Sequence, residues 1–345
     1  MNSRDIFSNA PEDSLLVVDG DWLAYMVACA LEKKSVKIYD EDGVFVKEYK
    51  NKTMFKEDTK NYNPNFRIED SQSLPKNYKN NMVFLVKKSI SKFLAESNCQ
   101  SVLIAMGGPT NFRTDLHLPN AYKGSRKDLA KPLSLYEVRD YVTNAYPSVI
   151  SEGEEADDIL SKYQFMSYQN RERRIVACTL DKDARGTPGY LYNPNESYLT
   201  FIEGLGYLSR TAKESASGVK KYKFYGEGRK WFYAQLITGD KADDYFPCDI
   251  YKQLNVNSIK APLITDLKAF NYLKDCTTDK ECWTVISDIY KGWYKDVKEW
   301  TDYTGKTVKG DWIDILQLYV DVVHMRRFDN DRVIVKTVLS KFDII

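Results

Sequence analysis

The sequence is poor in the residues that build zinc sites and disulfide frameworks. Its 345 residues include two histidines, His117 and His324, and six cysteines without a CxxC pair. Structural zinc sites use closely spaced cysteines and histidines, so such a site is not expected. We interpret the cysteines as reduced side chains of a cytosolic protein, and Cys178 in the apolar run IVACT is the clearest core cysteine.

Long apolar runs and a large excess of one charge are also absent. No stretch reaches the roughly 18 apolar residues that span a membrane, and the polar start MNSRDIFSNAPEDS has no signal-peptide core. We therefore expect a soluble, cytoplasmic protein with no membrane partner. Lysine plus arginine number 50 against 49 for aspartate plus glutamate. Any contact with a polyanion must therefore come from local basic patches.

The order of the apolar segments predicts an α/β fold with a mainly parallel central sheet flanked by helices. Short buried strands are indicated at 15–18, 101–106, 148–150 and 174–179, and helices at 22–31, 81–97, 133–144 and directly after 155. Alternating residues on either side of Asp42-Gly43 predict a hairpin. The polar stretch 51–79 is interpreted as a surface excursion.

The remainder of the chain predicts a second region. A hairpin or added strands are expected at 190–225, followed by a helix that ends near Thr238. Helical periodicity then dominates, with the best segments at 280–299 and 311–326. We accordingly predict a core of residues 1–248, with an insertion at about 35–80 and a basic, arch-like loop at about 107–132, and a mostly helical region of residues 249–345.

Acidic residues gather at four places where an apolar segment ends. The clusters are Asp19/Asp21, Glu154/Glu155/Asp157/Asp158, Asp181/Asp183 and Asp240/Asp243/Asp244. Each cluster alone is explained by a cap, a turn or a solvated face. Together they favour a site, because the carboxyl ends of parallel strands meet at one edge of a sheet. Glu152 and Glu154 are interpreted as solvated acids near a helix start.

Such a collection of carboxylates has a chemical use. Oxygen ligands select hard ions such as Mg²⁺ or Mn²⁺. Two such ions can activate water and stabilise an in-line displacement at phosphorus. The loop that follows the second predicted strand offers the complementary charge, with Phe112 and Tyr122 interleaved among Arg113, Lys123, Arg126, Lys127 and Lys131. It could neutralise phosphates and stack a base, although a solvated loop explains the same composition.

Five ordered motifs resemble the 5′→3′ exonuclease and flap endonuclease family, especially its bacteriophage members. The motifs are VDGDW, NFR followed by YKGSRK, EADD, LDKD and GDKADD, within residues 15–247. The resemblance implies a PIN-like nuclease core that binds two divalent ions, Mg²⁺ or Mn²⁺. It also implies cleavage of DNA at or near 5′ ends, in flaps or duplexes, and of RNA in RNA–DNA hybrids.

The resemblance also assigns roles to residues. The implied metal ligands are Asp19, Glu155, Asp157, Asp158, Asp181, Asp183, Asp240 and Asp243. Lys123 and Arg126 are implied as catalytic contacts to the scissile phosphate, and Tyr122 as a stacking aromatic. Arg113 and Lys127 complete the implied nucleic-acid-binding set.

Two departures from the family pattern stand out. The family places an aspartate after the second strand, where this chain has Gly107 and Gly108; Asp115 is a substitute candidate. The family also has a glycine-rich turn that holds duplex phosphates, whereas YFPCDIYKQLNVNSIK contains no glycine. Duplex binding by that route is not expected.

The leading hypothesis is a monomeric, divalent-metal-dependent 5′→3′ exonuclease or flap endonuclease. We expect it to serve phage DNA replication or host DNA degradation, in the host cytoplasm and with a replication-protein partner. Two alternatives stay open. One is a catalytically weakened nucleic-acid-binding accessory protein, and the other is an RNA-processing nuclease of the same fold.

Overall fold

A six-stranded sheet forms the centre of the protein. The computed structural model describes residues 13–58, 66–127, 129–214, 220–254 and 263–345. The strand order is β6-β5-β1-β7-β8-β9, in which the first five strands are parallel and β9 runs antiparallel to β8. The strands are β1 (Leu15–Asp19), β5 (Ser101–Met106), β6 (Ser148–Ile150), β7 (Ile175–Cys178), β8 (Gly189–Asn193) and β9 (Tyr198–Ile202).

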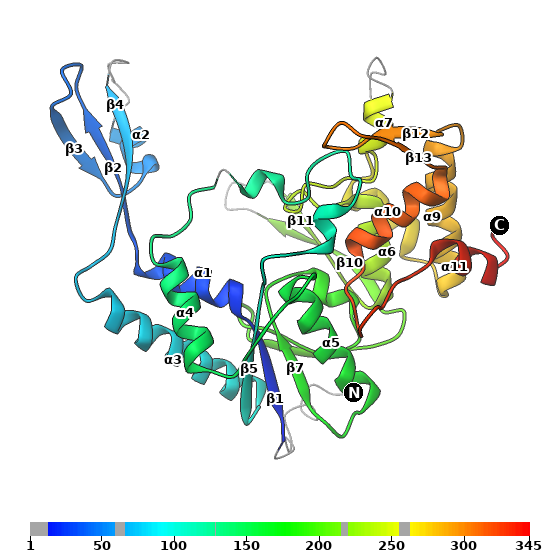
Figure 1. Ribbon diagram of the computed structural model, residues 1–345, viewed down its shortest axis with the longest axis horizontal. Coiled ribbons are helices and arrows are strands. Elements are labelled where there is room, and N and C mark those ends of the chain that lie inside the picture. The colour runs from blue at the N-terminus through cyan, green and yellow to red at the C-terminus, as the bar shows by residue number, and fades with distance from the viewer. Residues whose placement is uncertain (1–12, 59–65, 128, 215–219, 255–262) are drawn as a thin grey trace.

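Helices cover both faces of this sheet (Figure 1). One face carries α1 (Gly20–Leu31), α3 (Tyr78–Ser97) and α4 (Leu135–Ala145), and the other carries α5 (Ala156–Gln169). The alternation of side chains along β1 requires both layers, because Leu16 and Val18 pack with the first group of helices and Val17 packs with α5. The predicted fold class, a mainly parallel sheet flanked by helices, is confirmed.

The insertion after α1 forms a separate small sheet that stands away from the body (Figure 1). Its elements are β2 (Lys33–Tyr39), β3 (Phe45–Tyr49), α2 (Lys52–Asp58) and β4 (Arg67–Ser73), in strand order β3-β2-β4. The predicted hairpin is confirmed: Asp40 accepts the amide of Val44 at 2.8 Å, and Gly43 has a φ of +79°. The strand β4 was missed because RIEDSQS has almost no apolar pattern.

The second half of the chain adds a ribbon and a helical region. These elements are β10 (Tyr207–Glu214), β11 (Lys220–Glu227), α6 (Arg229–Thr238), α7 (Asp249–Leu254), α8 (Asp266–Leu273), α9 (Asp279–Tyr294), β12 (Glu299–Thr301), β13 (Thr307–Lys309), α10 (Trp312–Val323) and α11 (Val335–Lys341). The predicted hairpin and helical C-terminal region are confirmed. The helix predicted for 280–299 is too long, because α9 ends at Tyr294 and β12, which pairs with β13 and buries Trp300, begins at Glu299. None of the described helices has both the length and the apolar character needed to cross a membrane.

The basic loop between β5 and α4 is anchored on the helical region. It contains two short 3₁₀ turns, η1 (Phe112–Asp115) and η2 (Gly124–Arg126). Leu118 and Tyr122 belong to the same hydrophobic core as α6, α9 and α10. Trp300 donates its indole N–H to the carbonyl of His117 at 2.9 Å. The core that contains the C-terminal helices therefore also includes part of the loop, and the domain boundary at residue 248 stays a prediction.

A buried ion pair joins the loop, α5 and α10. Arg113 and Asp158 are both 0% exposed, and the guanidinium contacts the two carboxylate oxygens at 2.6 and 3.0 Å. Arg113 also donates to the carbonyl oxygens of Val322 and His324, both at 2.9 Å. The structure thus pairs both carboxylate oxygens of Asp158 with a buried guanidinium and keeps Arg113 away from the surface. We leave both residues out of the candidate site.

Removing the positive charge from this pair should destabilise the protein strongly. Arg113→Met would leave Asp158 as an unpaired buried charge, which costs about 3–5 kcal/mol. The double change Arg113→Met with Asp158→Leu should lose less, because no charge is then left buried. Urea unfolding measures both variants. Arg171→Met, which breaks an exposed pair with Glu203, is the control and should lose at most about 1 kcal/mol; an equal loss in Arg113→Met would contradict the assignment.

Candidate metal centre

The first group of acids forms where β1 and β7 end. Asp19 is the last residue of β1 and caps α1, since one carboxylate oxygen accepts the amide of Trp22 at 2.9 Å. The other oxygen accepts the hydroxyl of Thr179 at 3.0 Å, and the same hydroxyl oxygen accepts the amide of Asp181 at 3.0 Å. Thr179 therefore ties the ends of the two parallel strands together and fixes both acids.

The start of α5 adds two further acids to this place. Glu155 is the N-cap of α5, and Asp157 lies in its first turn. Together with Asp19, Asp21 and Asp181 they line a cavity of about 470 Å³, which Lys123 and Arg126 also line. The structure thus brings four of the predicted ligands, Asp19, Glu155, Asp157 and Asp181, into one cavity.

The second group of acids lies beside the first. Asp183 begins the 3₁₀ turn η3 (Asp183–Gly186), and Asp240 and Asp243 lie on the loop after α6. One carboxylate oxygen from each of the three lies within 4.8 Å of the others, and all three residues are at most 8% exposed. Three anions this close repel one another strongly unless a cation neutralises them. Lys182 contacts Asp240 at 3.0 Å and supplies part of that charge.

Asp181 lies between the two groups. Burial is the largest cause of the raised pKa of Asp19, Asp157, Asp183 and Asp243, and the charge of Asp181 raises the pKa of each of them further. The pKa values of Asp19 and Asp243 rise to about 6. Asp181 therefore interacts electrostatically with acids of both groups, and one of its carboxylate oxygens accepts the amide of Asp183 at 2.8 Å.

The basic loop places two positive side chains, Lys123 and Arg126, beside acids of both groups. Lys123 Nζ lies 2.5 Å from Glu155 Oε1 and 3.8 Å from Asp243 Oδ1. Arg126 contacts the same Asp243 oxygen at 2.8 Å. The backbone of Lys123 adopts a φ of +53°, and its amide donates to the carbonyl of Asp243 at 3.0 Å. The predicted phosphate-binding residues therefore stand at the mouth of the acidic cavity, with Lys127 exposed beside them.

Tyr122 differs from its predicted role. Only 7% of the residue is exposed, and its ring packs in the core of the helical region. Its hydroxyl donates to Glu155 at 2.9 Å and also lies 3.3 Å from Asp243. With so little surface exposed, the ring is not available to stack on a base, so Tyr122 joins two acids instead.

The two acids that precede α5, Glu152 and Glu154, differ in exposure. Glu152 is exposed, as interpreted from the sequence. Glu154 is 8% exposed and pairs with Lys162 at 2.8 Å and with Arg326 at 3.7 Å, so it is not a solvated acid. Its partners come from α5 and from the segment after α10, which no local pattern in the sequence indicates.

Gly107 and Gly108 leave no room for the aspartate that the family pattern expects. A Cβ at Gly108 would lie 1.9 Å from the carbonyl oxygen of Ser151. A Cβ at Gly107 would lie 2.5 Å from a carboxylate oxygen of Asp21, which accepts the Gly107 amide at 2.9 Å. Arg139 contacts the other oxygen of Asp21 and donates to the Gly107 carbonyl at 2.8 Å.

Asp21 therefore occupies the space beside the missing side chain and lines the acidic cavity. Asp21 was grouped with Asp19 from the sequence, without a predicted role as a ligand. Asp115, the substitute candidate, is exposed and lines a different cavity with Asp321 and Arg332. The structure does not bring Asp115 to the site.

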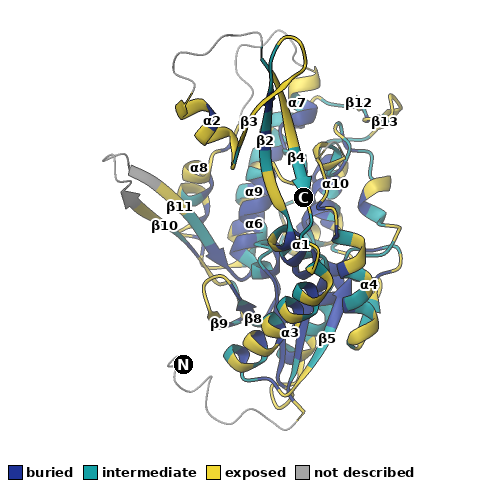
Figure 2. Cartoon of the chain, turned by 90° about the vertical axis from the view of Figure 1, so that its left-hand side faces the viewer, coloured by how far each residue is buried: buried dark blue, intermediate teal, exposed yellow. Residues whose placement is uncertain are grey.

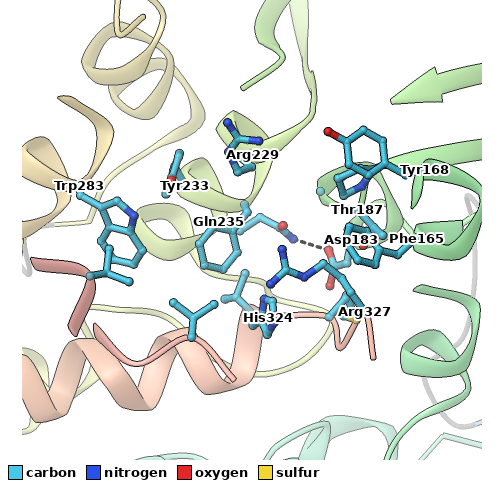
Figure 3. Close-up of a pocket in the computed structure, with 17 residues that line it drawn as sticks. Phe165, Tyr168, Asp183, Thr187, Arg229, Tyr233, Gln235, Trp283, His324 and Arg327 are labelled. Carbon is cyan, nitrogen blue, oxygen red and sulfur yellow. Dashed lines mark hydrogen bonds between the residues drawn. The ribbon is translucent and has the colours of Figure 1, made fainter. Parts of the chain in front are cut away.

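Asp183 also has a hydrogen-bond partner on α6. A cavity of about 320 Å³ adjoins it on the side of α6 and α10, and its walls include the aromatic side chains Phe165, Tyr168, Tyr233 and Trp283 (Figure 3). Gln235, on α6, donates its amide to Asp183. This hydrogen bond fixes the orientation of one carboxylate oxygen of Asp183.

The raised pKa of Asp19 makes the stability of the metal-free protein depend on pH. Its pKa is raised from the ordinary value of 3.8 to about 6, so the unfolded chain loses this proton at a lower pH than the folded chain. Ionisation then destabilises the folded state by up to about 3 kcal/mol, with no effect below pH 4 and the full effect above about pH 6.

Asp19→Asn should remove this destabilisation. Urea unfolding in EDTA should show a stability advantage of the variant that grows between about pH 4 and pH 6. An advantage of the same size at both ends of this range would contradict the raised pKa.

Sequence comparisons identify no family. No protein-family model matches the chain, and a search of curated proteins finds no match. Among solved structures, the chain is similar to a metal-bound bacteriophage T5 D15 protein, with 12% identity, coverage of 95% of this chain and 96% of that chain, and a TM-score of 0.46. It is also similar to the T5 flap endonuclease in a pseudo-enzyme–product complex with DNA and metal ions, with 11% identity, 96% and 98% coverage and a TM-score of 0.46. Overall similarities of this size assign no activity, which leaves the site itself as the basis for one.

Proposed function

We propose that this protein is a divalent-metal-dependent nuclease that hydrolyses phosphodiester bonds of DNA at or near 5′ ends, as a 5′→3′ exonuclease or flap endonuclease. The observation that carries the proposal is the pair of adjoining acid groups that meet at Asp181, with Lys123 and Arg126 at their junction. Similar acid groups without flanking cations would not favour a phosphate substrate, because acids alone repel it.

The donor set fits hard divalent ions. Asp19, Glu155, Asp157 and Asp181 would hold one ion, and Asp183, Asp240 and Asp243 would hold a second ion that Asp181 can also reach. All these donors are carboxylate oxygens, which favour Mg²⁺ or Mn²⁺ over softer metals. Such ions would supply an activated water and charge stabilisation for the leaving oxygen.

Lys123 and Arg126 would hold the scissile phosphate. Their charges now contact Glu155 and Asp243. Once cations neutralise these acids, the two basic side chains are free to bind phosphate oxygens instead. Lys123 caps η2 and Arg126 ends it, so this turn would hold the phosphate at the cavity that Asp181 also lines.

Further parts of the hypothesis rest on the resemblance alone. Cleavage of RNA in RNA–DNA hybrids, a replication-protein partner, a monomeric state and a phage source stay predictions. So does a contribution of the exposed Lys127 to nucleic-acid binding.

The first test is cleavage of a 5′-labelled duplex and of a 5′ flap. We expect cleavage with Mg²⁺ or Mn²⁺ and none with EDTA. The double change Asp181→Asn with Asp183→Asn should lower the rate at least about a thousandfold, because it removes the acid shared by both groups and one of its neighbours.

The matched control for this test is Glu152→Gln with Glu172→Gln, which removes two exposed acids and should leave the rate unchanged. Cleavage that persists in the Asp181/Asp183 variant would overturn the site. Binding of DNA by the wild-type protein with no cleavage at any metal concentration would favour the accessory-protein alternative.

A second test exchanges the position of one carboxylate. Asp21→Gly should weaken Mn²⁺ binding and lower the cleavage rate by about 10–100-fold. Gly107→Asp alone should destabilise the protein by about 1–3 kcal/mol, because its Cβ meets the Asp21 carboxylate.

Combining Asp21→Gly with Gly107→Asp removes the clash and returns a carboxylate to the same space, so stability and Mn²⁺ affinity should recover together. Calorimetric Mn²⁺ titration and urea unfolding measure the two quantities. Asp115→Asn serves as the control. If Asp115→Asn weakened Mn²⁺ binding as much as Asp21→Gly, the role given to Asp21 would be wrong.

A further inference from the structure

The ribbon β10–β11 projects from the body (Figure 2). Its two faces carry different side chains. On one face, Leu208 is 9% exposed in the core of the helical region, and Phe224 stacks near Trp231 with ring centroids 5.4 Å apart. Farther out on this face, Arg210 lies 3.6 Å from the ring centre of Tyr222. The base of this face is therefore packed on the protein.

Among the described residues, no side chain of the opposite face belongs to a hydrophobic core cluster. Side chains alternate along a strand, so Tyr207, Ser209 and Thr211 of β10 share this face with Lys223 and Tyr225 of β11, and the register pairs Ser209 with Tyr225 and Thr211 with Lys223. Tyr207 is 47% exposed. We call these five residues the free face. Glu227, which the register pairs with Tyr207, ends this face at its base; it is 7% exposed and accepts the hydroxyl of Tyr225. The free face therefore offers the hydroxyl groups of Tyr207, Ser209 and Thr211 and the ammonium group of Lys223, which are usual donors to phosphate and sugar oxygens.

The free face continues into the metal centre. A small cavity between the two is lined by residues that include Thr179, Asp181, Arg185, Tyr198 and Tyr225. Arg185 belongs to η3, two residues after Asp183, and its guanidinium lies 4.3 Å from the ring centre of Tyr225. A continuous surface therefore leads from Asp181 through Arg185 to the ribbon.

The charge of this segment differs from that of the whole chain. Residues 207–227 contain five basic residues and two acidic ones, whereas the whole chain has a net charge of +1. Lys223 contacts Glu196 at 2.9 Å, but both side chains are exposed, at 56% and 43%. An exposed pair of this kind contributes little, so Lys223 can exchange Glu196 for a phosphate.

We propose that the free face, with Arg185, binds the double-stranded part of the nucleic acid next to the bond that is cut. A two-stranded ribbon is narrow enough to lie in the major groove of a duplex. Eight residues of strand span roughly 27 Å, which is about eight base pairs at 3.4 Å each. The inference rests on the proposed nuclease function for the position of the cut, and it supplies a duplex contact in a chain whose sequence after Asp243 lacks the glycine-rich turn of the family pattern.

The test compares the two faces of the same ribbon. Tyr207→Ala with Lys223→Ser changes the free face, and Tyr222→Ala with Arg210→Ser is the matched control on the packed side. Each variant loses one tyrosine and one positive charge from β10–β11, so a general effect on the ribbon would appear in both. Affinity for a 5′-flap substrate with a 20-base-pair duplex and for a 20-nucleotide single strand is measured in EDTA across a salt series, so that no cleavage is needed.

We expect the free-face variant to bind the duplex substrate about tenfold more weakly, with a salt dependence lower by about one phosphate contact, and to bind the single strand as the wild type does. The control variant should bind both as the wild type does. Equal losses in both variants, no loss in the free-face variant, or a loss confined to the single strand would overturn the proposal. The two proposals can fail separately. If only the free-face variant loses duplex affinity but the wild-type protein cuts nothing with Mg²⁺, the nuclease function is overturned and the binding surface stands.

Discussion

The mutual repulsion of buried carboxylates is the constraint on which the rest of this structure depends. Both acid groups lie at the carboxyl edge of the parallel sheet, and Asp181 stands between them. The repulsion is reduced by ion pairs from Lys123, Arg126 and Lys182 and by the raised pKa values of the buried acids. Because bound cations would reduce it further, binding of a metal at the proposed site would also raise the stability of the fold.

This constraint explains why the basic loop is held in place from the helical side. Tyr122 packs in the core of the helical region while its hydroxyl contacts Glu155. The next residue, Lys123, has a left-handed backbone conformation that residues other than glycine rarely adopt. Its amide donates a hydrogen bond to the carbonyl of Asp243. The α5 side is fixed by the pair of Arg113 and Asp158, so the loop, the sheet edge and the helical region position Lys123 together.

The sequence predicted the features that follow from local pattern. Apolar runs predicted the parallel strands, and acids directly after those runs predicted which carboxylates would converge, because a strand's end lies at the sheet's edge. It could not separate Asp157 from Asp158, which have the same chemistry and adjacent positions. Only the tertiary structure shows that Asp158 faces a guanidinium 45 residues away.

The role of Asp21 was hidden for a related reason. Asp21 lies close to Gly107 because β1 and β5 are neighbouring strands and α1 begins directly after β1. The two residues are 86 positions apart in the sequence, so no motif spacing relates them. Tyr122 was misassigned because an aromatic residue next to basic residues has the same local signature whether it is exposed or buried.

The net charge of the chain is near zero, but acidic and basic side chains are separated in space at this edge of the sheet. The acids of the second group are at most 8% exposed, whereas Arg126 and Lys127 on one side and Lys223 on the other are exposed. A polyanion that approaches the second group would therefore meet these positive side chains before it meets the buried carboxylates. Screening limits such contacts to about 8–10 Å at ordinary salt, so for the proposed phosphate substrate the order in which these groups are encountered would matter more than the total charge.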